Sequence, residues 1–407
     1  MKVVELFSGI GSQAKALKRA GIRHEVVRIS EWDVNSIIAY DIIHNGAPDI
    51  EKYNHITKDE FIEVLASNNL SGNGKTPLSE KALHSMNYET LIRLYAAIKR
   101  TKNVPNVEYI QVADLPMVID VMTYSFPCQD LSNMGAIHGY TNGINKNHLT
   151  RSGLLWQVER IIVERKNAKL GLPKFLVLEN VPALTSKRNL ADFNLWKNTL
   201  ETLGYYNKAY KLNARNFGIP QNRERIVMIS VLTNGISKPK LDSYFEKHNL
   251  ESSEYLKSIA IKPWDLHELF NRTSNYEHEK RNSQPNDTLS RKTIWNRNPK
   301  LIDEDYSCAS IVPTITTKQD RHPNSGVIYY PTTRNNFRYL TPRECFLLMG
   351  FDENDYQALI DNNFLYKSNQ CFFTRDKFYK MIGNSIVVNV LEEVFKQVDE
   401  IRNLFCR

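Results

Sequence analysis

Residues 118–130 have the sequence VIDVMTYSFPCQD, which begins as an apolar run and ends in polar residues. The β-branched run over residues 118–122 predicts a buried strand. Pro127 cannot donate to a strand ladder, so we expect the strand to stop there. Cys128 would then stand at the carboxyl end of a parallel strand, where open α/β sheets bind ligands. A nucleophile and a free cysteine packed in the core are equally good interpretations of this run alone.

A second strand with a similar ending lies further along the chain. Residues 175–178 are Phe-Leu-Val-Leu, and residues 179–182, Glu-Asn-Val-Pro, follow directly. If the two strands are parallel, Cys128 and Glu179 reach the same edge of the sheet, as a nucleophile and an acid/base partner require. This pairing favours a catalytic role for Cys128.

Two arginines precede the strand predicted at residues 226–230. Arg223 and Arg225 alternate at strand spacing, so they share one face. Facing a pocket, they would suit a carbonyl, carboxylate or phosphate group. An exposed ion pair with Glu224 is the alternative.

The N-terminal segment predicts the start of a nucleotide-binding sheet. The predicted elements are a strand at 3–7, a turn containing Gly9 and Gly11, a helix at 13–20 and a strand at 25–30. Glu31 ends the second strand in a position to bind ribose hydroxyls, and Trp32 can stack on an adenine. A capping glutamate and a core tryptophan are the alternative. The pattern favours an adenosine-containing cofactor, although the full GxGxxG motif is absent.

Bulk properties narrow the class of protein. The chain has 407 residues and a formal net charge of +8, and a basic chain suits a polyanion such as nucleic acid. Its five cysteines are widely spaced, which argues against a disulfide framework or a zinc site and fits a reducing cytosol. We expect no signal peptide and no membrane span.

Several further segments carry structural predictions. Residues 56–100 predict a polar, partly helical excursion from the sheet, and residues 313–318 predict a strand. Residues 131–148 are rich in Gly and Asn, and we expect a mobile lid over the site. Thr341 and Glu344 form a predicted capping box at a helix start, with Pro342 at the first helical position. Residues 386–401 predict an amphipathic C-terminal helix.

Taken in order, these motifs resemble those of the DNA cytosine-5 methyltransferases. The matching motifs are Phe7-Ser8-Gly9-Ile10-Gly11, Glu31-Trp32, Phe126-Pro127-Cys128-Gln129, Glu179-Asn180-Val181, Gln221-Asn222-Arg223-Glu224-Arg225, Arg338-x-Leu340-Thr341-x-x-Glu344 and Gly383-Asn384-Ser385. Each alone is weak, but all in sequence are specific. The residues around Cys128 and Arg151 are most similar to CG-specific mollicute enzymes. The variable region shows no such similarity, so CG specificity is not carried over.

The resemblance implies an α/β fold with a Rossmann-like S-adenosylmethionine-dependent methyltransferase domain. Residues 1–270 plus 370–407 would form this discontinuous catalytic domain. Residues 271–369 would form a smaller inserted target recognition domain and hinge. Because residues 383–385 match a cofactor contact, the C-terminal helix should pack beside the first strand and helix.

The resemblance also implies residue roles. Cys128 would attack C6 of a flipped cytosine, Glu179 would hold and protonate N3, and Arg225 would contact O2 with Arg223 beside it. No metal is implied. The positions that match cofactor contacts are Phe7, Gly9, Gly11, Glu31, Trp32, Ile110, Pro127, Leu154, Asn384 and Ser385. Where the family has Asp-Ile at the end of the third strand, this chain is expected to have Tyr109-Ile110.

The implied substrate is duplex DNA, methylated in the prokaryotic cytosol or nucleoid by a monomer that pairs functionally with a restriction endonuclease. One eukaryotic branch of the family methylates a tRNA, but the long variable region favours DNA. A catalytically silent DNA-binding protein is a further alternative. It is disfavoured because every residue assigned to the chemistry is present.

Overall fold

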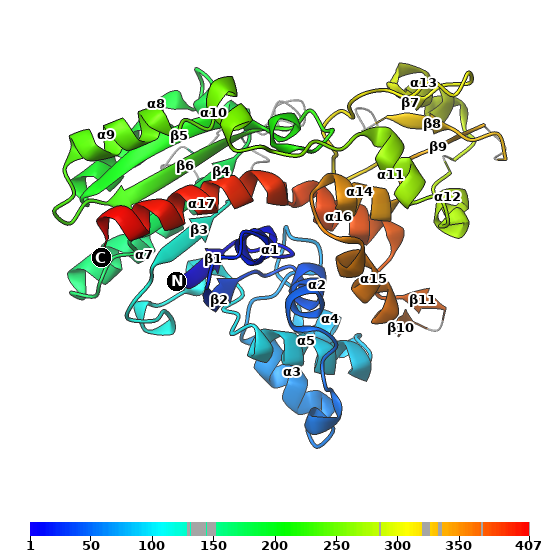
Figure 1. Cartoon of the computed structure of the whole chain (residues 1–407). Helices are drawn as coiled ribbons and strands as arrows, with labels where there is room; N and C mark the ends of the chain where they lie inside the picture. The colour runs from blue at the N-terminus through cyan, green and yellow to red at the C-terminus, as the bar shows by residue number, and fades with distance from the viewer. Residues whose placement is uncertain are drawn as a thin grey trace.

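The computed structural model describes residues 1–127, 131, 144, 152–284, 286–319, 326–332, 336–367 and 369–406. Cys128, Arg151 and most of the predicted lid over 131–148 lie outside the described residues. None of the helices described is long and apolar enough to cross a membrane. Helices and strands are labelled as in Figure 1.

A six-stranded sheet with the order β2-β1-β3-β4-β6-β5 lies at the centre of the protein (Figure 1). The strands are β1 (Lys2–Leu6), β2 (Glu25–Ser30), β3 (Val121–Tyr124), β4 (Phe175–Asn180), β5 (Tyr205–Asn213) and β6 (Glu224–Leu232). Strands β2, β1, β3 and β4 are parallel, and β6 is antiparallel to both of its neighbours. The parallel strands carry their carboxyl ends to one edge, and the predicted α/β fold is confirmed.

Strand β3 begins later than predicted. Val118 is 52% exposed and precedes the strand, which starts at Val121. Asp120 lies between them, with Oδ2 2.8 Å from the Lys2 backbone nitrogen and Oδ1 2.9 Å from Lys174 Nζ. The Asp120 carboxylate therefore links the residue before β3 to Lys2 at the start of β1 and to Lys174 just before β4. The apolar run in the sequence does not predict these contacts.

Apolar side chains cover both faces of the parallel strands. Val3, Val121 and Phe175 belong to one buried cluster, and the adjacent residues Val4, Met122 and Leu176 belong to another. Successive residues of a strand point to opposite faces, so each strand contributes to two cores. This explains why the strands are continuous apolar runs rather than alternating ones.

Helices surround this sheet (Figure 1). In the first part of the chain they are α1 (Ser12–Arg19), α2 (Val34–Asn45), α3 (Lys58–Ala66), α4 (Glu80–His84), α5 (Tyr88–Arg100), α7 (Leu155–Asn167), α8 (Leu190–Thr202), α9 (Lys238–Lys247) and α10 (Ser253–Ser258). Helices α3, α4 and α5 confirm the predicted helical excursion. Leu91, Leu94 and Ile98 of α5 are buried in the same cluster as α2.

The C-terminal helix returns to the first strand and helix, as predicted. Helix α17 (Val388–Phe405) lies along α1 in Figure 1. Ser385 Oγ is 2.7 Å from Ser12 Oγ, and the Ile386 N–H donates to Ser12 Oγ at 3.3 Å. Gly383, two residues before Ser385, packs directly on residues 316–317, where a Cβ would overlap the Thr316 carbonyl.

The variable region and its flanks form a second group of elements. They are α11 (Leu266–Arg272), α12 (Glu277–Asn282), α13 (Leu289–Arg297), β7 (Lys300–Ile302), β8 (Val327–Tyr329), β9 (Phe337–Arg338), α14 (Pro342–Leu348), α15 (Glu353–Asp361), β10 (Leu365–Lys367), β11 (Gln370–Cys371) and α16 (Arg375–Asn384). Strands β7, β8 and β9 make a separate small sheet. Figure 1 shows α13 with this sheet to one side of the central sheet. Division of the chain at residues 271 and 369 stays a prediction.

The strand predicted at residues 313–318 is wrong. The structure describes residues 313–318 and assigns no strand to them, and the isolated bridge between Val312 and Gln221 lies just before this segment. The Ile315 N–H donates to Gln221 Oε1 at 3.0 Å, and the Ile315 carbonyl accepts from Arg223 Nη1 at 2.9 Å. The Gln221 and Arg223 side chains therefore make the hydrogen bonds of the Ile315 backbone that a neighbouring strand would make in a sheet. The β-branched residues of this segment had suggested a strand.

The predicted helix start at Thr341 is confirmed and contains a buried ion pair. The Thr341 and Glu344 side chains make the reciprocal bonds of a capping box. Arg338 donates two hydrogen bonds to the fully buried Glu344 carboxylate, from Nη1 to Oε2 at 2.8 Å and from Nη2 to Oε1 at 2.9 Å. Thr273 Oγ1 also donates to this carboxylate at 3.1 Å, so the group joins three segments.

Replacing Arg338 with methionine is expected to lower the free energy of unfolding by about 3 kcal/mol, because Glu344 would be buried without its counter-ion. Urea unfolding followed by circular dichroism measures the loss. Arg272→Met is the matched control, since its ion pair with Glu353 is partly exposed and such pairs contribute about 1 kcal/mol or less. Equal losses in the two variants would contradict the prediction.

Candidate active site

The ends of β3 and β4 lie side by side, as the two strand endings predicted. Tyr124 pairs with Leu178 in parallel register. Beyond the strands, Asn180 Nδ2 donates to the Phe126 carbonyl at 3.0 Å, and Ser152 Oγ donates to the Pro127 carbonyl at 2.7 Å. The backbone that leads into Cys128 is therefore held beside residues 179–180. Cys128 itself lies outside the described residues.

Glu179 is a buried carboxyl group at this edge. It is 8% exposed, and its Oε1 lies 3.1 Å from Arg225 Nε on β6. Burial raises the pKa of Glu179, and the nearby Arg225 and Arg223 charges partly offset that rise. A carboxyl group with a raised pKa can give and take a proton near neutral pH, which is what an acid/base residue needs.

The two arginines have different partners. Arg225 contacts Glu179, whereas the Arg223 guanidinium donates to backbone carbonyls of Ile315 at 2.9 Å, Ser385 at 2.7 Å and Gly383 at 3.1 Å. Arg223 is 3% exposed and ties the C-terminal segment to β6. The observed contacts make Arg223 an anchor, and its predicted place beside the substrate stays a prediction.

The glycine turn after β1 leaves space on one side and packs tightly on the other. Phe7, Gly9 and Gly11 all have positive φ angles, of 58°, 57° and 82°. A Cβ at Gly9 would meet nothing within 4 Å, whereas one at Gly11 would overlap the His44 ring. Ser8 Oγ is buried with no hydrogen-bond partner among the described residues. Gly9 and Ser8 thus offer room and a polar group to a ligand, while Gly11 serves packing.

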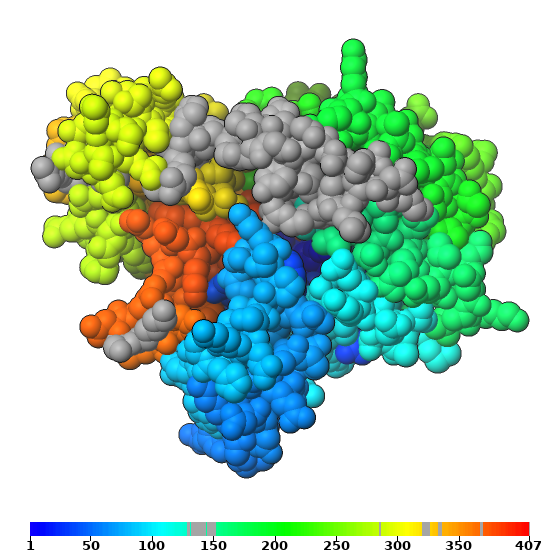
Figure 2. All heavy atoms as spheres, turned by 180° about the vertical axis from the view of Figure 1, so that it is seen from behind, coloured from blue at the N-terminus to red at the C-terminus, as the bar shows by residue number. Residues whose placement is uncertain are grey.

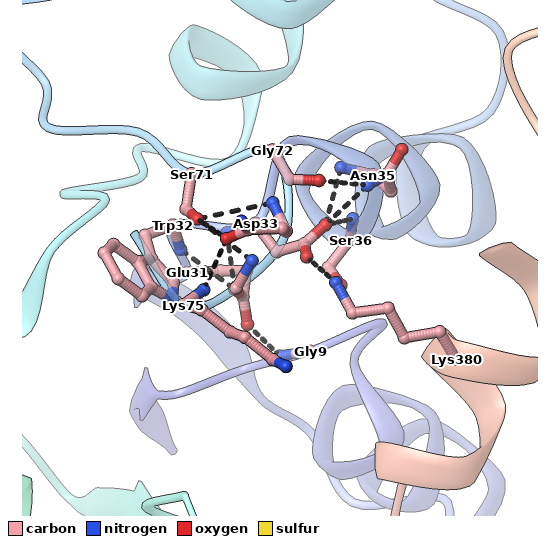
Figure 3. A network of polar contacts seen from close by, with 12 residues as sticks. Gly9, Glu31, Trp32, Asp33, Asn35, Ser36, Ser71, Gly72, Lys75 and Lys380 are labelled. Atoms are coloured by element: carbon pink, nitrogen blue, oxygen red, sulfur yellow. Dashed lines mark hydrogen bonds and ion pairs between the residues drawn. The ribbon is translucent and has the colours of Figure 1, made fainter. Parts of the chain in front are cut away.

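Glu31 closes this turn (Figure 3). Its Oε2 accepts from the Gly9 N–H at 2.9 Å, and its Oε1 accepts from the N–H groups of Trp32 at 2.9 Å and Asp33 at 2.8 Å. The Asn103 side chain binds the Glu31 backbone twice: its Oδ1 accepts from the Glu31 N–H at 3.0 Å, and its Nδ2 donates to the Glu31 carbonyl at 2.9 Å. Burial, then the neighbouring Asp33 carboxylate, raises the pKa of Glu31 to about 7. The structure therefore brings Glu31, Trp32 and Gly9 together.

The remaining predicted cofactor positions lie on separate segments. Leu154 is half-buried in a short 3-10 helix, Ser152–Leu154, and Ser152 contacts the Pro127 carbonyl. Asn384 is exposed at the end of α16, and Ser385 is buried against Ser12. Their contacts with a cofactor stay predictions.

The expected strand end at Tyr109-Ile110 is wrong. Val107–Tyr109 is a 3-10 helix, Tyr109 is 57% exposed, and Ile110 is fully buried in an apolar cluster. The segment beside β2 is instead at Asn103, which bridges to Ile29, and the Val104 N–H donates to the Ile29 carbonyl at 3.0 Å. Asn106 is the next polar residue after this bridge. A single bridge leaves no periodic pattern in the sequence, so the position of this segment beside β2 was not predicted. The cofactor contact of Ile110 stays a prediction.

Figure 2 views the protein from the opposite side to Figure 1. Helices α3, α4 and α5 form the blue lobe that projects from the lower part of this face. The orange C-terminal elements lie beside this lobe, and α15 among them packs against α2, the helix that α5 also contacts.

Comparisons with known proteins identify the family to which this chain belongs. The family described as C-5 cytosine-specific DNA methylase matches residues 73–400. The chain is 33% identical to "Orphan methyltransferase M.SssI" of Spiroplasma monobiae, over 98% of this chain and 97% of that protein. It is 34% identical to "Type II methyltransferase M2.ScrFI" of Lactococcus lactis subsp. cremoris, over 98% of this chain and 99% of that one.

Among solved structures, the S. pombe Dnmt2 methyltransferase is similar in fold, with a TM-score of 0.59 and 17% identity, covering 99% of this chain and all of that one. The Entamoeba histolytica methyltransferase EhMeth has a TM-score of 0.56 at 17% identity, covering 98% of each chain. Since the family match spans most of the chain and both relatives align over nearly its whole length, the chain belongs to the C-5 cytosine-specific DNA methylase family and is a DNA (cytosine-5-)-methyltransferase.

Proposed function

We propose that this enzyme methylates C5 of a cytosine within one short duplex DNA sequence, through a covalent bond between Cys128 and C6. The observation that carries the proposal is the buried Glu179–Arg225 pair at the edge where Asn180 holds the backbone leading into Cys128. A base in a duplex cannot reach such a site, so the target cytosine must leave the stack.

The residues around the glycine turn fit S-adenosylmethionine. Glu31 can accept hydrogen bonds from ribose hydroxyls, Trp32 can pack on an adenine, and the open space at Gly9 admits a ligand close to the backbone. The Ser8 hydroxyl, which has no hydrogen-bond partner within the described part of the chain, can bond to a polar group of the ligand. When bound, the cofactor supplies an electrophilic methyl group on its sulfonium sulfur.

The proposed chemistry makes C5 of cytosine nucleophilic. The Cys128 thiolate adds to C6, and Glu179 gives its proton to N3, so that the C5=C6 electron pair becomes available at C5. Arg225 holds Glu179 and contacts the base carbonyl at O2. After C5 has gained the methyl group, a base removes the C5 proton. The freed electron pair re-forms C5=C6 and expels Cys128, and N3 returns its proton to Glu179.

We propose a protective role in restriction and modification, with residues 271–369 reading the target sequence. One relative is named a type II methyltransferase, and another is named an orphan methyltransferase. The enzyme would act as a monomer on DNA in a prokaryotic cytosol or nucleoid. It would be paired functionally with a restriction endonuclease that cleaves the same target sequence when the sequence is unmethylated.

Bisulfite sequencing of mixed-sequence plasmid DNA, after incubation with the enzyme and S-adenosylmethionine, tests the proposal. Protected cytosines are expected in one short shared sequence, because recognition requires specific base contacts. An incubation without the cofactor is the control. If DNA stays unprotected while the cofactor binds, the DNA substrate is overturned, and tRNA would be tested next.

A further inference from the structure

An ion pair joins the predicted cofactor segment to helix α16. Lys380 Nζ lies 2.5 Å from Asp33 Oδ2, and the Asp33 side chain is 9% exposed. The other oxygen, Oδ1, caps α2 by accepting from the Asn35 N–H at 2.9 Å and the Ser36 N–H at 3.4 Å. Asp33 therefore has one oxygen for its own helix and one for a residue more than three hundred positions away.

The loop at residues 71–76 closes over this ion pair (Figure 3). The Ser71 N–H donates to the Trp32 carbonyl at 2.7 Å, and the Val34 N–H donates to the Ser71 carbonyl at 2.9 Å. Gly74 lies so close that a Cβ there would be 3.3 Å from Asp33 Oδ2 and 3.5 Å from Lys380 Nζ. The loop thus helps to bury Asp33, whereas the Lys380 side chain stays 34% exposed, and burial strengthens the effect of the Asp33 charge on its neighbours.

The Asp33 carboxylate also acts on Glu31, its neighbour two residues before it. The Asp33 N–H donates to Glu31 Oε1 at 2.8 Å, so the two acidic residues share one turn of backbone. Lys380 from α16 contacts Asp33, and Lys75 lies on the loop beside it. Lys377, also on α16, donates to the Phe372 carbonyl at 2.7 Å, and the Asp33 charge acts on it without direct contact. Burial lowers the pKa of Lys377 to about 8, so its charge is partly lost in mildly alkaline solution.

We propose that Lys380 is a positioning residue for the cofactor: its ion pair with Asp33 partly offsets the Asp33 charge and so favours the ionised form of Glu31 that accepts from the ribose hydroxyls. This inference rests on the proposed role of Glu31. An unpaired Asp33 would disfavour a second negative charge beside it. A protonated Glu31 accepts fewer hydrogen bonds, so cofactor binding should weaken as Glu31 gains its proton.

The test is the dissociation constant for S-adenosylmethionine, measured by calorimetry between pH 6 and pH 9. For the wild type we expect binding to weaken as the pH falls through about 7, where Glu31 takes up its proton. In Lys380→Met this inflection should move up by about one unit. Binding should then be about fivefold weaker at pH 7 and near wild type at pH 9. Lys380→Arg should restore the wild-type profile.

Lys396→Met is the matched control, because Lys396 forms a similarly short ion pair with Glu393, at 2.6 Å, on α17. Its profile should equal the wild type. A Lys380→Met variant that binds equally weakly at every pH, or whose inflection does not move, would overturn the inference and leave Lys380 a structural residue.

Asp33→Asn tests the inference independently, because it removes the negative charge that Lys380 pairs with. Asparagine caps a helix about as well as aspartate, so α2 should keep its cap while the anion is lost. Combined with Lys380→Met, it should return the inflection to the wild-type value or below. Glu31→Gln separates the two proposals. If it binds like the wild type, the proposed role of Glu31 fails. If it removes an inflection that Lys380→Met does not move, only this inference fails.

Discussion

Replacing Cys128 with serine is expected to reduce methyl transfer by about 10⁴-fold or more, while S-adenosylmethionine binding stays at the wild-type level. A serine hydroxyl is much less acidic than a thiol, so little alkoxide is available to add to C6. Transfer of a labelled methyl group to DNA measures the loss, and calorimetry measures cofactor binding. Cys371→Ser is the control, because Cys371 is exposed on the short strand β11.

The covalent bond itself can be trapped. DNA with 5-fluorocytosine at the target cannot lose a proton from C5, so Cys128 cannot be expelled and the adduct should persist through a denaturing gel. Cys128→Ser should give no such band, and Cys371→Ser should give one. Substantial turnover by Cys128→Ser would remove Cys128 from the mechanism.

Replacing Glu179 with glutamine is expected to lower kcat by roughly 10²- to 10⁴-fold with little change in DNA affinity. Glutamine can still hydrogen-bond to N3 and the exocyclic amine, but it cannot transfer a proton to N3. Single-turnover methylation with saturating DNA separates the chemical step from binding. Glu224→Gln is the matched control, since Glu224 lies one residue before Arg225 and pairs with Lys211 at a half-exposed site, 3.0 Å apart.

The pH profile gives a second readout for Glu179. The group must be protonated to give its proton to N3, and burial raises its pKa. The wild-type rate of the chemical step should therefore fall as the pH rises above that pKa, whereas the residual rate of Glu179→Gln should lack this fall. If the variant keeps both the rate and the profile, Glu179 is not the acid.

Local and pairwise patterns in the sequence predicted β1, β2, β3, β4 and β6 and the edge that β3 and β4 share, but they did not predict β5. Strand β2 has the predicted bounds, because its turn signals and apolar run are local. The paired endings after β3 and β4 predicted that their loops share an edge, since parallel strands align their carboxyl ends. The capping box at Thr341 depends on residues three positions apart, and it was equally predictable.

Contacts between distant segments could not be predicted in this way. Residues 313–318 have the composition of a strand, yet their partners are the Gln221 and Arg223 side chains. Arg223 matched a family motif in a predicted substrate site, and the structure shows it bound to three carbonyls, two of them near the C-terminus. A side chain has several partners within reach, and only packing selects among them.

The sequence by itself determined the α/β fold, the family and the residues that carry the proposed chemistry, because these follow from local periodicity and from the order of short motifs. Only the tertiary structure decided how Glu31 is held, that Lys380 forms an ion pair with Asp33, and that Glu179 is buried against Arg225. Burial and the distance between charges set the protonation of a carboxyl group, and both depend on segments that meet only when the chain has folded.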